Sequence, residues 1–251
     1  MKHLLLTGDD FGRSSAVNEA IERHHQAGLL TQASLMVNEH AAAEAVRIAR
    51  RNPGLGIGLH LTLCDGRASQ VSPLTDAAGR FTASPAVAGL RYAFERKLAA
   101  PLAAEIAAQF TRFRAFGFAP RAVDGHTHLH LHPTIRRALA PHLAGCPLLR
   151  LVREPGNRAP VALTFRALCA AAVRLPIRAA DRVYGLRDTG RMTGDRLAAL
   201  IRGLPSGLSE IYFHPGAEPS EPDFIALRGV LAEQQIHLVS ATTLPPPQSA
   251  A

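Results

Sequence analysis

Two adjacent aspartates, Asp9 and Asp10, follow the first apolar run of the chain. The leucines at positions 4–6 predict a short buried strand that stops at Gly8, so both carboxylates would lie at the carboxyl end of that strand. Open α/β sheets and α/β barrels carry their chemistry at this end. Neighbouring carboxylates repel each other, and a bound cation would offset the repulsion. The alternative is a solvated turn in which Asp10 or a later residue caps a helix that starts near Ser14.

A second cluster, residues 123–133, reads Val-Asp-Gly-His-Thr-His-Leu-His-Leu-His-Pro. Side chains alternate between the two faces of a strand, so a strand through this segment would place four polar side chains on one face. They are Asp124, His126, His128 and His130. Core packing does not explain the cluster, because each buried imidazole needs partners for both ring nitrogens. The alternatives are a surface tract and a divalent metal site, and the alternation with Leu and Thr favours the metal site.

A further histidine, His60, lies within the β-rich apolar run at 56–63. A single histidine on a strand is typical of a satisfied core position. Together with Asp10 and one histidine from 126–130, however, it would give one carboxylate and two imidazoles. This donor set suits zinc, iron, cobalt or manganese and leaves positions open for water and substrate. The spacing does not decide which histidine of the second cluster is the ligand.

The elements that must position these residues follow from the alternation of short apolar runs with helical patterns, which is the order of βα repeats. Strands are predicted at 3–7, 31–37, 56–63, 121–126, 147–152, 209–214 and 236–240. Helices are predicted at 14–27, 40–51, 101–116, 134–143, 160–174, 193–202 and 221–233. The predicted fold class is α/β, an irregular, TIM-like (β/α) barrel with about seven strands.

The domain organisation is expected to be simple, because the sequence has no internal repeat and no linker that would divide it. We expect one barrel domain over residues 1–243. The Gly- and Pro-containing segment 65–100 predicts a loop insert over the carboxyl ends of the strands. The Pro-, Ser- and Ala-rich tail, residues 244–251, is expected to be disordered.

The composition is basic, with a formal net charge of +8. A basic chain binds nucleic acid or an anionic membrane surface in some proteins, and a GC-rich genome also raises arginine content without any functional cause. Trp is absent and aromatic residues do not alternate with basic ones, so a nucleic-acid partner is not expected.

The expected location is the cytoplasm. The sequence has no apolar stretch long enough for a membrane-spanning helix, and a signal peptide would remove the aspartate pair near the N-terminus. The three cysteines, Cys64, Cys146 and Cys169, have no metal-binding or redox spacing and are odd in number, which indicates unpaired thiols in a reducing compartment.

Four motifs resemble those of the YdjC-like carbohydrate deacetylases. They are Thr-Gly-Asp-Asp-Phe-Gly at 7–12, Gly-Leu-His-Leu at 58–61, Asp-Gly-His-Thr-His-Leu-His at 124–130 and His-Pro-Gly at 214–216. The resemblance extends from residue 3 to about residue 240, with the motifs in the family's order and spacing. Three further stretches, at 33–38, 65–67 and 89–94, make the chain most similar to the deacetylases associated with hopanoid biosynthesis.

The resemblance implies an irregular (β/α) barrel that uses one divalent metal ion to remove the N-acetyl group from an amino sugar. Zinc is the favoured ion and magnesium the alternative. By position, Asp10, His60 and His126 match the metal ligands, Asp9 matches the catalytic base and His214 matches the general acid. The subgroup implies an N-acetylglucosaminyl hopanoid as substrate, and a soluble chitooligosaccharide is the alternative.

Four further residues are expected near the substrate or behind the ligands. His128 and His130 are candidates for substrate contact or for support of the metal ligands. Arg153 and Glu154, at another strand end, would orient Asp9 or the sugar, and a surface ion pair is the alternative for them.

A hopanoid substrate would require peripheral contact with an anionic membrane, at the inner face for a cytoplasmic enzyme. Spread positive charge would favour that contact, and Leu90, Tyr92 and Phe94 of the insert would enter the interface. The alternative is that the insert is a plain lid over the sugar site.

Two rival functions remain at this stage, a non-catalytic sugar- or lipid-binding barrel with a structural metal and a metal-dependent phosphoesterase. Asp9 beside three ligands argues against the binding protein, because structural metal sites are usually closed. A phosphoesterase usually needs a second metal and more carboxylates. The sequence does not predict an oligomeric state.

Overall fold

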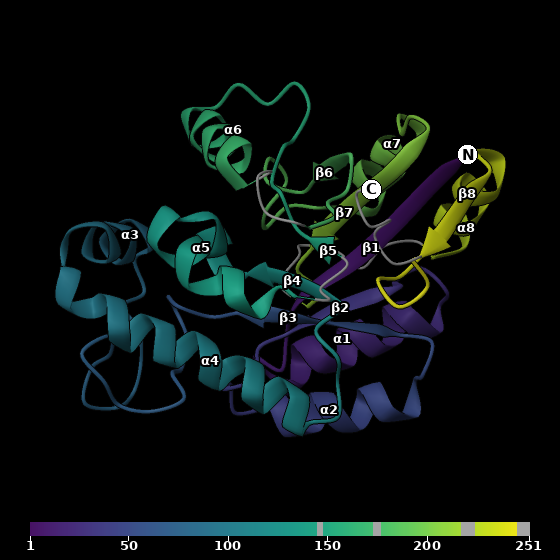
Figure 1. Ribbon diagram of the computed structural model, residues 1–251. Coiled ribbons are helices and arrows are strands. Elements are labelled where there is room, and N and C mark those ends of the chain that lie inside the picture. Colours follow the sequence, from purple (N-terminus) through teal and green to yellow (C-terminus); the bar gives the residue numbers. More distant parts are fainter. Residues whose placement is uncertain (145–147, 173–176, 217–223, 245–251) are drawn as a thin grey trace.

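A computed structural model describes residues 1–144, 148–172, 177–216 and 224–244 of the chain (Figure 1). Within these ranges, eight strands form one parallel sheet in the order β5-β4-β3-β2-β1-β7-β6, and β8 pairs with β1 outside this path. The strands are β1 (Lys2–Phe11), β2 (Gln32–Leu35), β3 (Gly56–Leu61), β4 (Ala122–Gly125), β5 (Leu148–Leu149), β6 (Arg182–Tyr184), β7 (Gly207–Phe213) and β8 (Ile236–Val239).

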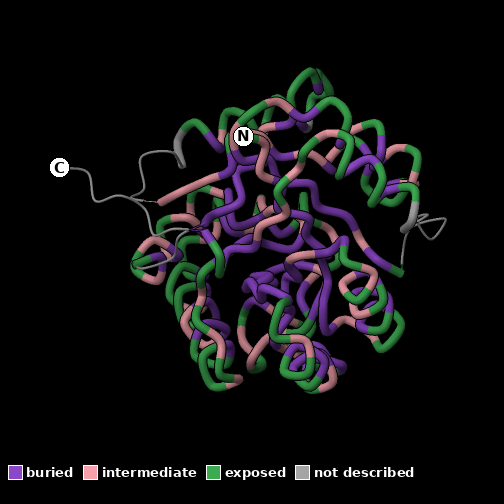
Figure 2. Tube along the Cα trace, turned by 90° about the vertical axis from the view of Figure 1, so that its right-hand side faces the viewer, coloured by how far each residue is buried: buried purple, intermediate pink, exposed green. Residues whose placement is uncertain are grey.

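Helices surround the sheet, and buried residues gather along its central strands while the outer sides of the helices are exposed (Figure 2). The α-helices are α1 (Ser15–Gln26), α2 (Ala42–Arg51), α3 (Pro85–Phe94), α4 (Ala99–Ala115), α5 (Pro133–Leu139), α6 (Pro160–Ala172), α7 (Gly194–Arg202) and α8 (Phe224–Glu233). Short 3₁₀-helices are η1 (Arg96–Leu98), η2 (His126–Leu131) and η3 (Ala140–His142).

The first strand organises the sheet, because it pairs with three other strands. One edge of β1 pairs with β7 from Lys2 to Gly8. The other edge is shared: β8 pairs with the stretch from Lys2 to Leu5, and β2 pairs from Thr7 onwards. The curled sheet ends at β5 and β6, and between these edges the amide of Leu149 donates to the carbonyl of Arg178 at 2.8 Å.

Alternation along the strands separates two hydrophobic clusters. Leu4 and Leu6 belong to the large cluster that also takes in helical residues such as Ile21. Leu5, on the other face of β1, packs in a small cluster with Leu148 and other residues of the strands. The interior of the curled sheet is therefore apolar near the start of the strands.

The α/β barrel-like fold predicted from the sequence is confirmed. All seven predicted strands have counterparts, but β6 was not predicted, because three residues are too few to give a periodic signal. The helix predicted at 134–143 is split into α5 and η3. Residue 147 of one predicted strand, residues 173–174 and 221–223 of two predicted helices, and residues 245–251 of the predicted tail lie outside the described residues.

The insert at 65–100 is more ordered than the predicted loop, because it contains α3 and η1. Tyr92 is buried, and its hydroxyl donates to the carbonyl of Leu63 at 2.7 Å, so the prediction that Tyr92 is exposed is wrong. Leu90 and Phe94 of the same helix are 61% and 79% exposed. Over the described ranges, each helix is too short or too polar to cross a membrane.

Candidate active site

An irregularity in β1 places the two aspartates. Between Gly8 and Phe11, β1 holds one residue more than the facing stretch of β2, which is a β-bulge. Asp10 has a φ of 64°, in the left-handed region that Asp tolerates better than most residues. Neighbouring side chains of a regular strand point to opposite faces. The bulge instead lets both Asp9 and Asp10 reach the same cavity.

The histidine cluster does not continue as a strand, so its histidines do not share the one face on which a strand would have placed them. β4 ends at Gly125, and η2 follows with left-handed φ values of 54° at Thr127 and 60° at His128. The chain can fold back here because Gly125 has no side chain: a Cβ would lie 2.8 Å from Nδ1 of His130. The imidazoles of η2 therefore have different neighbours.

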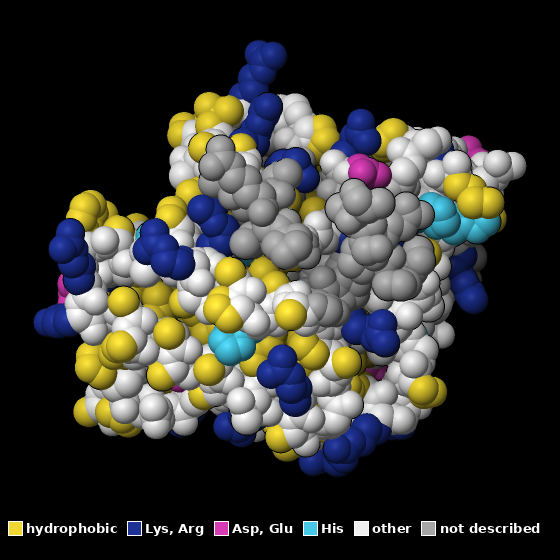
Figure 3. Space-filling model, viewed as in Figure 1, with side chains coloured by type: hydrophobic (Ala, Val, Ile, Leu, Met, Phe, Trp, Pro, Cys, Tyr) yellow, Lys and Arg dark blue, Asp and Glu magenta, His cyan; other side chains and the backbone are white. Residues whose placement is uncertain are grey.

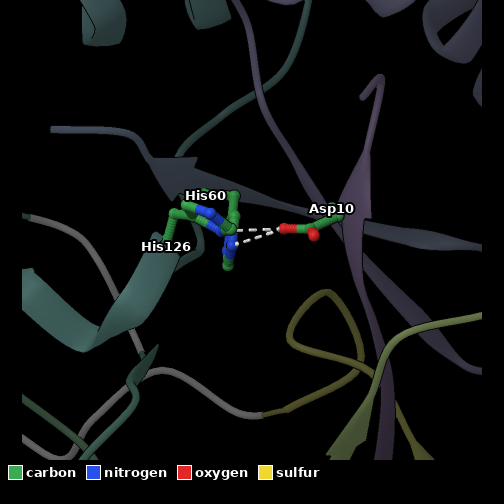
Figure 4. A group of neighbouring side chains, drawn as sticks. All are labelled: Asp10, His60 and His126. Carbon is green, nitrogen blue, oxygen red and sulfur yellow. Dashed lines mark ion pairs between the residues drawn. The ribbon is translucent and has the colours of Figure 1, made fainter. Parts of the chain in front are cut away.

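Asp10, His60 and His126 converge from β1, β3 and the end of β4 (Figure 4). Oδ1 of Asp10 lies 3.2 Å from Nε2 of His60 and 2.9 Å from Nδ1 of His126. One possible ligand atom from each residue lies within 4.8 Å of the others, and all three residues are buried. The fold thus brings together residues that are 50 or more positions apart in the sequence.

These three residues fit a divalent metal ion. Oδ1 of Asp10 and Nε2 of His60 are buried and make no hydrogen bond within the described residues, although they lie close together. Burial disfavours the charged form of Asp10, but the two imidazoles outweigh burial and hold the pKa of Asp10 well below its ordinary value. An ionised carboxylate and two imidazoles are a common ligand set for such an ion.

Asp124 fixes the ring of His60. Nδ1 of His60 donates to Oδ1 of Asp124 at 2.6 Å, and the hydroxyl of Ser34 donates to Oδ2 of Asp124 at 2.6 Å. Nε2 of His60 is then left toward Asp10, as in the carboxylate–histidine pairs that support metal ligands. Burial lowers the pKa of an imidazole, but Asp124 and Asp10 outweigh burial and raise the pKa of His60 to about 10.

The guanidinium of Arg150 is buried inside the curled sheet and binds three carboxylates. Its two Nη atoms donate to the two oxygens of Asp9 at 2.7 and 2.9 Å. Nε donates to Oε1 of Glu210 at 2.9 Å, and Nη2 lies 2.9 Å from Oδ2 of Asp124. The cation also covers the ring of Tyr212, 4.5 Å from its centroid. One side chain therefore orients Asp9 and the partner of His60 together.

The groups around Arg150 differ in how strongly the protein favours their charged forms. Burial lowers the pKa of a guanidinium, but the carboxylates outweigh burial and hold the pKa of Arg150 well above its ordinary value. Burial raises the pKa of Asp124, yet Arg150 and His60 reverse the effect and keep that pKa below its ordinary value. Burial dominates for Glu210, whose pKa is raised. Arg150 and Asp124 therefore stay charged, and Glu210 is easier to protonate than a solvated glutamate.

Arg150 and Glu210 were not among the candidates from the sequence. Each lies inside a predicted strand, 147–152 or 209–214; Arg150 is between two leucines, and Glu210 is between a serine and an isoleucine. A charged residue inside a buried strand needs a partner, and that is the signal that would have found both of them.

A cavity of about 820 Å³ is lined by six of the nine candidate residues: Asp9, Asp10, His60, His126, His128 and His214. On one side, Arg13 donates to Oδ2 of Asp65 at 2.8 Å and to Nε2 of His126 at 3.1 Å. Other lining residues come from the segments around α6 and before α7, and we call these the α6–α7 wall: Phe165, Leu186 and Thr189. The cavity combines buried donors with an apolar wall, as expected for a small-molecule site.

The remaining histidines have separate positions. His128 lines the cavity, with Nε2 2.9 Å from the hydroxyl of Tyr212, and burial together with Arg150 lowers its pKa well below the ordinary value. His130 donates from Nε2 to the carbonyl of Arg150 at 2.8 Å, and burial lowers its pKa to about 4. His214, half-buried, follows β7 and lines the cavity.

Arg153 and Glu154 follow β5 but are not the partners of Asp9. The guanidinium on Asp9 belongs to Arg150, three residues earlier. Glu154 is 5% exposed and accepts hydrogen bonds from Asn157 and from the backbone after β6. It is therefore a buried, hydrogen-bonded residue and not part of a surface ion pair.

The family model described as YdjC-like protein matches residues 3–240. A carbohydrate deacetylase from Brevibacillus brevis is 39% identical over 136 residues, covering 53% of this chain and 52% of the relative. One from Mus musculus is 33% identical over 250 residues, covering 87% and 79%. A chitooligosaccharide deacetylase from Serratia marcescens is 33% identical over 172 residues, covering 64% of each chain. The chain spans about half the length of several curated relatives that it matches.

A solved structure supports the fold. A protein from Enterococcus faecalis, proposed as a cellobiose-phosphate cleavage protein, superposes with a TM-score of 0.70 at 21% sequence identity. The match covers 96% of this chain and 98% of that one. At this identity the likeness establishes the fold alone.

The first prediction concerns Arg150. Arg150→Ala should lower the free energy of unfolding by about 3–5 kcal/mol, because it leaves buried carboxylates without their cation. Urea unfolding would measure the change. Arg196→Ala is the control, since Arg196 is partly exposed and pairs with Asp188 at 3.0 Å, and it should cost less than about 1 kcal/mol. Equal losses in the two variants would contradict the central role of Arg150.

The second prediction concerns the three donors. His60→Ala should abolish stoichiometric metal binding, because two ligands remain and the support from Asp124 no longer acts on a ligand. Elemental analysis after dialysis against zinc would measure occupancy. His237→Ala, an exposed histidine of β8, is the matched control and should keep the parent occupancy. Full occupancy in His60→Ala would show that the metal binds elsewhere.

Proposed function

The chain belongs to the YdjC-like protein family, and on that premise we propose that it is a metal-dependent deacetylase that hydrolyses the N-acetyl group of an amino sugar. The observation that carries the proposal is the position of Asp9. This carboxylate reaches the same cavity as Asp10, His60 and His126, yet both its oxygens bind Arg150 and are not needed as ligands. The site thus holds a separate base, which a purely structural metal site would not need.

The proposed reaction is hydrolysis of an amide in the cavity. A divalent ion held by Asp10, His60 and His126 supplies a Lewis acid when bound, and the two imidazoles favour zinc over magnesium, which prefers oxygen ligands. Asp9 accepts the proton of the attacking water, and Arg150 holds its carboxylate in one orientation. His214, which directly follows the carboxyl end of β7, donates a proton to the leaving amine.

The neighbouring histidines fit supporting functions. His128 lines the cavity and stays neutral, so it offers a hydrogen bond to substrate rather than a charge. His130 fixes the backbone of Arg150 and supports the base indirectly.

A phosphoesterase is less well supported. A second group of possible ligands, Asp9, His60 and Asp124, lies beside the first. Arg150 and Nδ1 of His60 already occupy these carboxylates, so a second cation would have to displace Arg150. This arrangement favours one metal ion and amide hydrolysis.

The substrate we favour is an N-acetylglucosamine unit on a hopanoid lipid, and the surface of α3 supports it. Val87, Leu90 and Phe94 are 46%, 61% and 79% exposed and lie on one face of α3 at spacings of three and four. Pro85, the first residue of that helix, lines the cavity. Hydrophobic side chains are visible over this side of the molecule, with Lys and Arg among them (Figure 3). An apolar helix face beside the cavity, with Lys and Arg on the same side of the molecule, suits an anionic bilayer.

A soluble chitooligosaccharide is the alternative substrate. The relative from Serratia marcescens carries that name, and the cavity has room for sugar units. Contact with the inner membrane face belongs to the lipid hypothesis alone, whereas the expected cytoplasmic location does not depend on the substrate.

The third prediction tests the base. Asp9→Asn should keep its metal and lose about 10²–10⁴-fold in kcat, because an amide does not accept a proton from water at neutral pH. Acetate release from N-acetylglucosaminyl lipid and from N,N′-diacetylchitobiose, called chitobiose below, would measure turnover, and elemental analysis would confirm the metal. More than about a tenth of the parent kcat would remove Asp9 from this role.

The fourth prediction tests the lipid substrate. The protein should bind anionic vesicles at low salt, and Leu90→Ser with Phe94→Ser should weaken the binding, because it removes apolar side chains from the interface. Vesicle flotation over a salt series would measure it. Val71→Ser is the control, since Val71 is 64% exposed on the insert but lies outside α3.

Absence of vesicle binding, with faster hydrolysis of chitobiose than of the lipid, would contradict the hopanoid substrate. It would leave the deacetylase proposal in place.

A further inference from the structure

Glu154 joins the two segments that form the α6–α7 wall of the cavity. Its Oε2 accepts from the side-chain amide of Asn157 at 2.6 Å and from the backbone N–H of Arg187 at 3.0 Å. Its Oε1 accepts from the backbone N–H of Gly185 at 3.3 Å. Glu154 is 5% exposed, so these are buried hydrogen bonds to a carboxyl group.

One of the two segments leads to α6. Oδ1 of Asn157 accepts from the N–H of Ala159, directly before α6 begins at Pro160. Phe165 of that helix lines the cavity. The contact of Glu154 with Asn157 therefore fixes the start of the helix that carries Phe165.

The other segment is residues 185–193, which connect β6 to α7, and we call it the β6–α7 loop. Leu186 and Thr189 of this loop line the cavity. Gly185 begins the loop with a φ of 132°, and a Cβ there would lie 2.3 Å from the carbonyl oxygen of Tyr212. Glu154 binds the backbone on either side of Leu186, so it fixes the path of the chain at the residue that faces the cavity.

The position of Glu154 in the fold explains why a side chain is needed here. β5 and β6 are the two ends of the strand path, and they are not hydrogen-bonded to each other as a ladder. Among the described strands, β5 pairs with β4 and β6 pairs with β7, so each strand has a ladder on one side only. The sheet therefore does not tie the segment after β5 to the segment after β6, and Glu154 connects the two across the open edge.

We propose that Glu154 is a positioning residue that holds the α6–α7 wall in place for the substrate's sugar or aglycone. The inference rests on the proposed function for the identity of the substrate, but the contact between Glu154 and the β6–α7 loop does not. Loss of the contact should loosen the wall and leave Asp9 and His60 in place, because Arg150 binds Asp9 and Asp124 binds His60. We therefore expect a rise in KM that is larger than the fall in kcat.

Limited trypsin digestion tests the contact without reference to activity. Arg187 and Arg191 are exposed in the β6–α7 loop and are trypsin sites once the loop opens. In Glu154→Gln, an amide has one acceptor oxygen in place of two, and cleavage after Arg187 or Arg191, identified by mass spectrometry, should be about tenfold faster. Glu154→Asp, which shortens the reach, should show the same direction of change if Glu154→Gln does not fold.

Asp188→Asn is the matched control. Asp188 is in the same loop and pairs with Arg196, but it does not contact Glu154 in the described structure. Cleavage in this control should stay near the parent rate, and thermal unfolding should show that neither variant has lost its global fold.

Kinetics test the consequence for substrate. Glu154→Gln should raise KM for chitobiose or the lipid about tenfold, with kcat within about threefold of the parent. Unchanged cleavage of the loop would overturn the proposal, and so would faster cleavage with an unchanged KM. A parent protein that releases no acetate would overturn the proposed function instead, while the digestion would still decide whether Glu154 holds the loop.

Discussion

The buried guanidinium of Arg150 is the interaction on which the candidate site depends. It binds both oxygens of Asp9 and contacts Asp124, which in turn holds the ring of His60. The proposed base and one proposed metal ligand are therefore oriented by the same cation. Burying three carboxylates without a cation would be prohibitive, so the arrangement forms only when the strands that carry these residues close around Arg150. The site therefore acquires its geometry in the same step in which the sheet folds.

Backbone irregularities determine which neighbouring side chains reach the cavity. A regular strand would send Asp9 and Asp10 to opposite faces, and the bulge in β1 brings both to the cavity. Left-handed backbone at Asp10, Thr127 and His128 costs free energy, of the order of 1–3 kcal/mol at each residue. Such strain persists only where the surrounding contacts hold it, and here it coincides with the cavity. The strained positions are therefore part of how the site is built.

Apolar periodicity is a local signal, and it predicted the barrel and seven of its strands. The Asp and His motifs predicted Asp10, His60 and one histidine of 126–130 as donors, and only the family resemblance selected His126. Sequence reasoning predicted a strand at 121–126 but gave no signal for η2, since nothing in the alternation of His with Leu and Thr reveals the turn after Gly125. It missed Arg150 and Glu210, whose partners lie on strands that are distant in sequence. It treated Tyr92 as exposed, because α3 shows apolar residues on two faces and only tertiary contacts decide which face is covered. A single sequence does not show which side chains that are distant along the chain will contact each other.

Strands β1 to β4 support the proposed metal ligands, and the segments after β5 and β6 support the α6–α7 wall. Two of the proposed metal ligands come from β1 and β3, and the third, His126, directly follows β4. These three strands belong to a continuous hydrogen-bonded series through β2. A rigid sheet suits this part, because a small displacement of a ligand or base is costly for chemistry. The α6–α7 wall lies where the path of strands ends, and side-chain contacts hold it in place of a ladder. A wall held this way can change to fit a different sugar or aglycone without disturbing Asp9 or the donors. Under the proposed function, the open edge between β5 and β6 is then the part of the fold in which substrate preference can vary without a change in the proposed base and metal donors.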